Sequence, residues 1–164
     1  MSIRGEVWET GTVLSLNTSR LTGEKKTPAA EVELRENFGI VGDAHTGDGI
    51  ARYPHRQVSL LARESIDTMV SRGADVAPGS FAENITTNGL TLTDFPTGSI
   101  LEFERGPILE VTQIGKECHT RCAIFQAVGD CVMPREGIFC RVKKGGVIFV
   151  GDTITVYKRG EYDG

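Results

Sequence analysis

The chain has 164 residues, of which 39% are hydrophobic and 24% are charged, as expected for one globular domain over residues 1–164. The net charge of −4 excludes a surface that is basic overall, so we expect no nucleic-acid partner. No apolar run approaches the roughly 20 residues of a membrane span, and the first residues lack a signal pattern. We therefore expect a cytoplasmic protein with no membrane partner. In that reducing compartment we interpret its four cysteines first as free thiols or metal ligands, and only second as disulfides.

The first 61 residues predict short strands separated by loops. Gly5–Leu14 is expected to form a strand, and the polar stretch 16–29 a loop or hairpin. Alternating apolar and acidic residues at Ala30–Leu34 predict a half-buried strand, and Gln57–Leu61 is a short apolar run. The Gly-rich stretch GIVGDAHTGDG at 39–49 predicts a loop whose backbone can approach a ligand closely, although an ordinary surface loop has the same composition.

The clearest helix pattern lies at Ala62–Arg72. Ile66, Met69 and Val70 fall on one face, which is expected to pack into the core, and Gly73 supplies a helix stop.

Further strands are expected at Ile100–Phe103, Ile108–Ile114, Ile138–Val142 and Val147–Tyr157. Short strands separated by glycine, proline and asparagine predict a mainly β protein, either a barrel or a sandwich, with one or two helices at its rim.

The densest group of reactive side chains surrounds Cys118, just after the strand expected to end at Ile114. Lys116, His119 and Arg121 all lie within three residues of this cysteine. Nearby positive charge lowers the pKa of a thiol, so we interpret Cys118 as reactive.

The other three cysteines leave alternatives open. On a helix, Cys122 would share a face with Cys118, where two thiols could form a disulfide, relay a persulfide or hold a soft metal. Free cysteines are often small buried hydrophobes, and we favour that interpretation for Cys122, Cys131 and Cys140. Their spacing differs from the paired C-x2-C pattern of structural zinc, so the zinc signal is weak.

A second polar group combines Asp43 and His45 with His55, Arg56 and Gln57. Exposed backbone N–H groups and the planar fork of an arginine suit phosphate or another oxyanion. The structural alternative is that Asp43 caps a turn while His45 is exposed.

Two weaker signals complete the set. Glu83 and Asn84, in the stretch 78–90, either orient a ligand or satisfy loop backbone groups. Residues 116–144, which include Arg135, hold six basic and three acidic residues. This local excess suits a small anionic ligand, unless the charges are simply solvated. The chain has no P-loop, G-x-G-x-x-G, HExxH or G-x-S-x-G motif, which weakens nucleotide hydrolysis, hydride transfer and acyl hydrolysis.

Four stretches resemble, in order, the MOSC domain, the module named for the C-terminal part of molybdenum cofactor sulfurase. They are GIVGDAHTGDG at 39–49, PGSFAENITTNGL at 78–90, ILEVTQIGKECH at 108–119 and GGVIFVGDTITV at 145–156. The likeness covers about residues 5–158 and is greatest to the small stand-alone bacterial branch. It implies a β-barrel with a few short helices.

The resemblance also implies roles for individual residues. Cys118 matches the family's functional cysteine, whose thiolate can ligate molybdenum in the molybdenum cofactor (molybdopterin) or carry sulfur as a persulfide. Basic residues would then bind the phosphate of the pterin. The cofactor-binding candidates are Arg56, Gln57, Lys116, Arg121, Arg135, Asp43, His45 and Asn84.

Three functions stay open from the sequence. The first is a module that binds the cofactor or carries sulfur, with a cysteine desulfurase or a molybdoenzyme as partner. The second is a molybdenum-dependent reductase of small N-hydroxylated compounds, in which His119 or His45 would donate a proton. The third is an interaction module that holds zinc or no metal. Pyridoxal phosphate belongs to another domain of the sulfurase and is not expected here.

Overall fold

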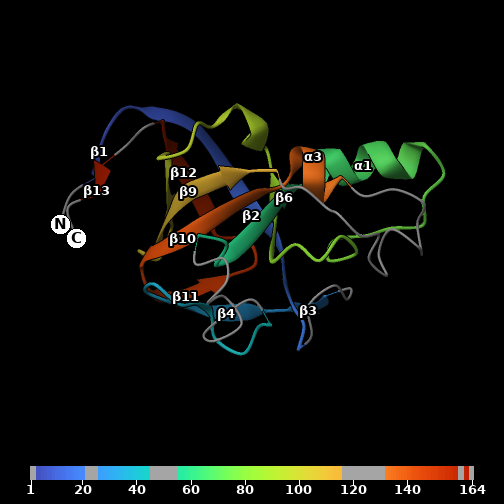
Figure 1. Cartoon of the computed structure of the whole chain (residues 1–164), viewed down its shortest axis with the longest axis horizontal. Helices are drawn as coiled ribbons and strands as arrows, with labels where there is room; N and C mark the ends of the chain where they lie inside the picture. Colours follow the sequence, from blue (N-terminus) through green and yellow to red (C-terminus); the bar gives the residue numbers. More distant parts are fainter. Residues whose placement is uncertain (1–2, 21–25, 45–54, 116–131, 159–160, 163–164) are drawn as a thin grey trace.

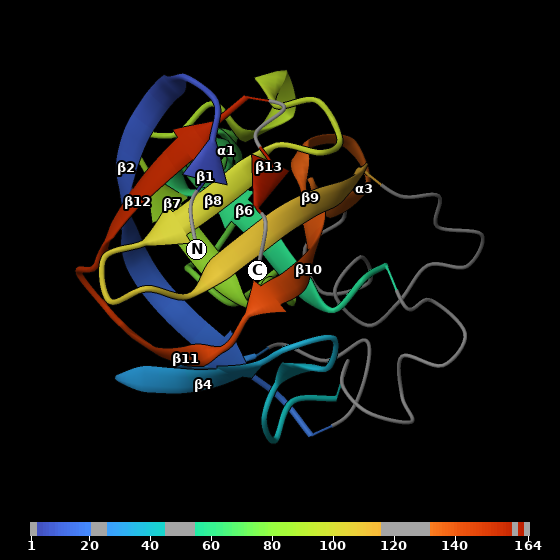
Figure 2. The same ribbon diagram turned by 90° about the vertical axis from the view of Figure 1, so that its left-hand side faces the viewer.

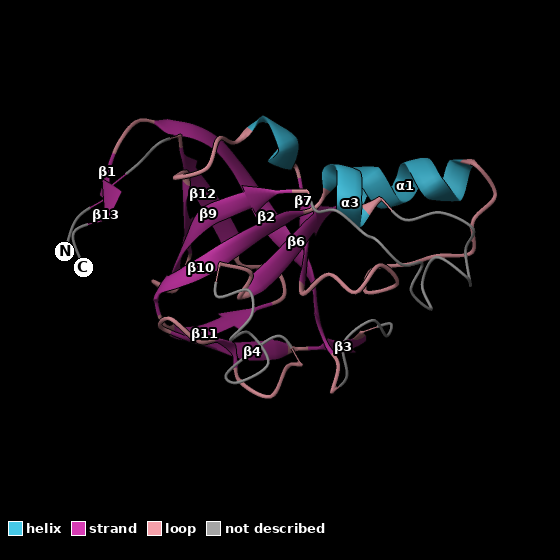
Figure 3. Ribbon diagram, viewed as in Figure 1, coloured by secondary structure: helices cyan, strands magenta, loops and turns pink. Residues whose placement is uncertain are grey.

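The computed structural model describes residues 3–20, 26–44, 55–115, 132–158 and 161–162. Strands dominate this part of the chain, and seven of them close into a barrel (Figures 1 and 3). In order around the barrel they are β2 (Val7–Thr18), β7 (Ile85–Asn88), β6 (Val58–Ala62), β10 (Ile138–Lys144), β9 (Ile108–Ile114), β8 (Ile100–Phe103) and β12 (Thr153–Tyr157). Pairing of β12 with β2 closes the ring, and only the β6–β7 pair among these is parallel. The predicted mainly β barrel is confirmed.

Shorter strands flank the barrel. β3 (Thr27–Ala29) pairs with the end of β2, which confirms the hairpin predicted for 16–29. A second sheet lies beneath the barrel in Figure 1 and contains β11 (Gly146–Phe149), β4 (Glu31–Arg35) and β5 (Gly39–Ile40). Away from this sheet, β1 (Ile3–Arg4) pairs with β13 (Glu161–Tyr162), so the first and last described strands lie side by side (Figure 2).

The hydrophobic core has two parts. One fills the barrel, with Leu16, Leu101 and Phe103 among its fully buried side chains. The other packs helices α1 (Arg63–Ser71) and α3 (Met133–Glu136) against the barrel wall at one end, where the two helices lie side by side (Figure 1). A 3₁₀ turn, η2 (Leu92–Asp94), follows β7. Among the described residues, no helix is long and apolar enough to cross a membrane.

The predicted helix is confirmed, but one residue of its predicted core-facing side is exposed. Ile66 and Met69 are buried, whereas Val70 is 48% exposed. Because Ser65 is buried as well, the buried face of α1 is centred between Ser65 and Met69 and leaves Val70 at its edge. Gly73 follows the helix with φ +93°, as its predicted role as a stop requires.

One strand prediction was wrong, and one strand was not predicted. The strand expected at Val147–Tyr157 is divided into β11 and β12 by a tight turn. In this turn Asp152 Oδ2 accepts a hydrogen bond from Phe149 N at 3.0 Å, and Gly151 has φ +94°. β7 lies within the stretch 78–90, for which the sequence predicts no strand. Its neighbouring glycine and asparagine mark turns, but the four residues between them pair with strands on both sides.

Candidate functional site

A hydrogen-bonded cluster of His55, Arg56 and Gln113 lies where β9 ends. Gln113 Oε1 is 2.8 Å from His55 Nε2 and 3.0 Å from Arg56 Nε. The amide nitrogen of Gln113 donates to the carbonyl oxygen of Gly115 at 2.6 Å. One glutamine side chain thus connects the segment before β6 to the backbone that leaves β9. This segment was predicted to bind an oxyanion, whereas Gln113 was not predicted at all.

These contacts fix the orientation of the Gln113 amide. Turning the amide by 180° would bring its oxygen against the Gly115 carbonyl and its NH₂ group against the N–H of Arg56. Because an amide oxygen only accepts hydrogen bonds, His55 Nε2 must carry the proton in its contact. The cluster therefore presents two N–H donors that converge on one oxygen.

Backbone contacts hold the same segment in place. The hydroxyl of Thr112 donates to the carbonyl oxygens of His55 and, at 3.1 Å, of Phe139. The Arg56 guanidinium carbon lies 5.4 Å from the centre of the Phe139 ring, within the range of a cation–π interaction. Gln57 is buried, and its Oε1 accepts a hydrogen bond from Val142 N at 3.0 Å. Both His55 and Arg56 are half-buried, so their positions are set by the barrel.

The cluster lies close in sequence to the predicted thiol. Gly115 is the last described residue before Cys118, it has φ +67°, and its N–H donates to the Gly137 carbonyl at 2.7 Å. Cys118 follows Gly115 by three residues in the sequence. Several residues with predicted roles lie outside the described residues: His45, Lys116, Cys118, His119, Arg121, Cys122 and Cys131.

Asp43 lies in a buried ion pair. Its Oδ1 is 2.8 Å from Lys26 Nζ, and both side chains are fully buried. The same oxygen accepts from Ser19 N at 3.0 Å, and Lys26 Nζ donates to Ser19 Oγ at 3.1 Å. Asp43 therefore anchors the end of the loop after β5 to the β2–β3 hairpin. Lys26 was not predicted, because a lysine in a polar stretch is ordinarily solvated.

Asn84 is fully buried and its side chain bonds to protein groups on two strands. Its Oδ1 accepts from Ser59 N at 3.0 Å and from Ser59 Oγ at 3.1 Å. Its Nδ2 donates to the Asn17 carbonyl at 3.3 Å. This geometry matches the structural alternative for the 78–90 stretch, in which Asn84 satisfies backbone groups.

Glu83, the neighbour of Asn84, is a buried carboxyl group. Its Oε2 accepts from Gly79 N at 2.9 Å and from Thr86 Oγ1 at 2.7 Å, while its Oε1 has no hydrogen-bond partner among the described residues. Burial raises the pKa of Glu83 above its usual 4.5, and the hydrogen bonds from Gly79 and Thr86 only partly oppose this.

We predict that Glu83 makes the protein less stable as the pH rises above 4.5. A raised folded-state pKa contributes stability at pH values below 4.5, and that contribution is lost as the pH rises through the folded-state value. Urea unfolding across a pH series measures the effect. Relative to Glu83→Gln, the free energy of unfolding of the wild type should fall with rising pH, and parallel curves for the two proteins would contradict the assignment.

The remaining predicted residues are placed as follows. Arg135 is exposed on α3. Cys140 is fully buried inside the barrel, and burial strongly raises the pKa of its thiol, so its interpretation as a small buried hydrophobe is confirmed. Within the described ranges, no group of three or more His, Cys, Asp or Glu side chains could hold a metal.

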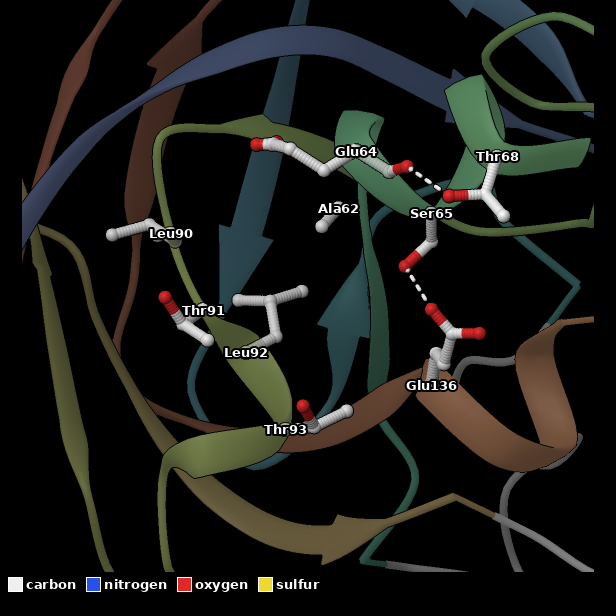
Figure 4. Close-up of a pocket in the computed structure, with 9 residues that line it drawn as sticks. All are labelled: Ala62, Glu64, Ser65, Thr68, Leu90, Thr91, Leu92, Thr93 and Glu136. Atoms are coloured by element: carbon white, nitrogen blue, oxygen red, sulfur yellow. Dashed lines mark hydrogen bonds between the residues drawn. The ribbon is translucent and has the colours of Figure 1, made fainter. Parts of the chain in front are cut away.

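A pocket of about 240 Å³ lies between α1, α3 and the segment after β7 (Figure 4). Ser65 Oγ donates to Glu136 Oε1 across it at 2.6 Å, and Glu64 and three threonines also line it. None of the predicted site residues lines this pocket. Its lining contains carboxylates and no cationic side chain, so it does not suit an anionic cofactor.

Comparison with known proteins adds the following. The family model described as "MOSC domain" matches residues 41–155, more than half of the chain. Among solved structures, the YuaD protein from Bacillus subtilis superposes with a TM-score of 0.75 at 20% identity, covering 96% of this chain and all of that one. YiiM from Geobacillus stearothermophilus superposes with a TM-score of 0.68 at 21% identity, covering 91% of this chain and 76% of that one. YiiM from Escherichia coli superposes with a TM-score of 0.66 at 19% identity, covering 92% of this chain and 70% of that one. These structures share the fold. A search of curated proteins found no match.

Proposed function

Because the chain belongs to the MOSC domain family, we propose that it binds a molybdenum–pterin cofactor, or carries sulfur as a persulfide, on Cys118. One observation supports this beyond family membership. The cluster of Arg56, His55 and Gln113 lies at the end of β9, and Gln113 precedes Cys118 by five residues in the sequence. Positive charge near a thiol favours its thiolate form and suits an anionic partner.

Within this proposal, the cationic side chains bind the anionic part of the cofactor. Arg56, whose Nε donates to Gln113, would contact the phosphate through its guanidinium. Lys116, Arg121 and Arg135 would add positive charge, and His45 and His119 would form hydrogen bonds with the ligand. Asp43, Gln57 and Asn84 would act indirectly, by holding the backbone of the surrounding loops, since their side chains are buried.

The side chains present fit such a cofactor in two respects. A thiolate is the ligand that a soft-ligand metal prefers, and a half-buried arginine suits a phosphate. When bound, the cofactor would supply redox chemistry at molybdenum. The role of Cys118 would be to supply the thiolate, and that of the cluster to orient the phosphate.

The persulfide form of the proposal follows ordinary thiol exchange. The Cys118 thiolate attacks the outer sulfur of a donor persulfide, R–S–SH, so a new S–S bond forms and the donor's S–S bond breaks. The products are Cys118–S–SH and the donor thiolate, with no net oxidation. A cysteine desulfurase would be the natural donor, and a molybdoenzyme the natural receiver of sulfur or cofactor.

The test is the content of the purified protein from a host that makes the cofactor. Molybdenum, released pterin and sulfur bound to thiols are measured in the wild type, in Cys118→Ser and in Cys140→Ala. Cys140→Ala is the matched control, because it removes a thiol that is fully buried. We expect the wild type and Cys140→Ala to carry cofactor or sulfur and Cys118→Ser to lose it. Equal content in all three proteins would refute the proposal.

A further inference from the structure

We propose that the pocket between α1, α3 and the segment after β7 binds a small organic cation, in which an ammonium group is carried on a short apolar body (Figure 4). None of the described residues predicted for the cofactor or sulfur site lines this pocket. The inference therefore goes beyond the proposed function and does not depend on it.

The size of the pocket and its apolar floor indicate the body of the ligand. The pocket volume is about 240 Å³. A dry cavity of about 150 Å³ holds a benzene molecule, so this volume suits a ligand of roughly ten non-hydrogen atoms. Three buried apolar side chains line the pocket, those of Ala62, Leu90 and Leu92. They give a short alkyl or aryl group a surface to pack against.

Two carboxylates from different helices indicate the charge of the ligand. Glu64 comes from α1 and Glu136 from α3 (Figure 4). Glu136 Oε1 accepts from Ser65 Oγ at 2.6 Å, and Glu64 Oε2 accepts from Gly89 N at 3.3 Å, so each carboxylate keeps a second oxygen for a ligand. No ion pair within the described part of the chain includes either glutamate.

The basic residue beside Glu64 does not neutralise this charge. Arg63 Nη1 lies 3.2 Å from Asp67 Oδ2, and Arg63 Nε donates to Asn88 Oδ1 at 2.9 Å, so its guanidinium is held by groups that do not line the pocket. The first turn of α1 adds the positive end of a helix dipole, but this amounts to about half an elementary charge. The two carboxylates outweigh it, so the pocket attracts cations.

The hydroxyl groups of the pocket are set as hydrogen-bond acceptors. Ser65 Oγ donates to the carboxylate of Glu136 at 2.6 Å. Thr68 Oγ1 donates to a backbone carbonyl of α1, and Thr91 Oγ1 to a carboxylate of β2, each at 3.1 Å. A hydroxyl has a single proton to donate, so each of these oxygens can only accept from a ligand. An ammonium group, which has three donors and no acceptor, matches such a lining.

The same lining favours an organic cation over a metal ion. Among the described residues, no group of three or more His, Cys, Asp or Glu side chains could hold a metal. Hard cations such as Mg²⁺ and Ca²⁺ require about six or more oxygen ligands and make no use of an apolar floor. The pocket instead combines acceptors on its walls with apolar side chains beneath them, which suits a ligand that is charged at one end only.

The test compares two probes of the same size that differ in charge. Phenethylammonium and the neutral phenethyl alcohol are each titrated into the isotope-labelled full-length protein, and the backbone amide resonances are followed by NMR. The resonances that shift locate the site, and their dependence on probe concentration gives the dissociation constant. The spectrum also shows whether each variant is folded.

We expect phenethylammonium to bind with a dissociation constant of about 1 mM, as is typical of a ligand with so few atoms. It should shift the amides of Ser65, Thr68 and Thr93. Phenethyl alcohol should bind about tenfold more weakly, because it carries no charge for the carboxylates. Glu64→Gln and Glu136→Gln should each weaken binding of phenethylammonium about three- to fivefold, and added salt should weaken it too.

Asp75→Asn is the matched control. Asp75 is exposed beyond the other end of α1 and does not line the pocket, so the variant loses one negative charge but should keep the wild-type dissociation constant. If Glu136→Gln does not fold, Glu64→Gln carries the test, because the Glu64 side chain is exposed.

Four results would overturn the proposal. They are equal affinity for the two probes, an equal loss of affinity in Asp75→Asn and Glu136→Gln, shifts confined to residues outside the pocket, and displacement of phenethylammonium by an equal concentration of Mg²⁺. The first would mean that charge plays no part, and the second that the probe senses only the net charge of the protein. Because the protein is titrated without a molybdenum cofactor, failure here leaves the cofactor and sulfur measurements unaffected.

Discussion

Lys26→Met is expected to lower the free energy of unfolding by about 3–5 kcal/mol. The lysine side chain is fully buried beside Asp43, at 2.8 Å, and its replacement leaves the Asp43 carboxylate buried without its counter-charge. The N–H of Ser19 still donates to that carboxylate, but hydrogen bonding from a neutral group does not offset the loss of the cation. Urea unfolding of the variant and the wild type measures the difference.

The matched control for this prediction is an exposed ion pair. Arg63 and Asp67 on α1 lie 3.2 Å apart, and their side chains are 45% and 57% exposed. Arg63→Met should cost less than about 1 kcal/mol, because water solvates the remaining carboxylate. If Lys26→Met and Arg63→Met lowered the free energy of unfolding by similar amounts, burial would not be the reason that the Lys26–Asp43 pair stabilises the protein.

Gly79→Ala is expected to destabilise the protein by about 1–3 kcal/mol more than Gly98→Ala. Both glycines have φ +91°, so the strain of holding an alanine at a positive φ angle is the same at each position, about 1–2 kcal/mol. They differ in surroundings. A Cβ at Gly79 would lie 2.6 Å from the Lys26 carbonyl oxygen, whereas no atom of the described residues would lie within 4 Å of a Cβ at Gly98.

The difference in unfolding free energy between Gly79→Ala and Gly98→Ala therefore measures the steric clash at Gly79 separately from the strain of the positive φ angle. At Gly79 the clash would also displace the segment that carries Lys26, whose N–H donates to the Gly79 carbonyl at 3.0 Å. Thermal and urea unfolding of both variants give the comparison. Equal losses of unfolding free energy at the two positions would mean that the segment carrying Lys26 moves away from the new methyl group without an energetic cost. Gly79 would then be needed only for its φ angle.

Local patterns predicted most of the strands and the helix. The alternation in Ala30–Leu34 appears in β4 as buried Val32 and Leu34 between exposed neighbours, and the predicted bounds of β9 are those observed. Period-two and helical patterns reflect burial of one face, which is a local property. The break between β11 and β12 escaped prediction, because it depends on the Asp152 side chain bonding back to Phe149.

The candidate site was predictable only in part. Arg56 and the loop at Asp43 were identified from residue type and nearby glycines. Gln113 and Lys26 were not, because their importance comes from contacts across 57 and 17 residues of sequence. Gln113 lies in the stretch ILEVTQIGKECH, and a polar residue near the end of an apolar strand, just before a cysteine, was the only available signal.

The most direct test of the central proposal is native mass spectrometry of the wild type and of Cys118→Ser, each purified from a host that makes the molybdenum cofactor. We expect the wild type to carry the added mass of the cofactor or of a sulfur atom, and the variant to have the mass of the bare chain. The size of the added mass distinguishes a metal ligand from a persulfide carrier. The same added mass on both proteins, or none on either, would contradict the assignment of Cys118 as the functional thiol.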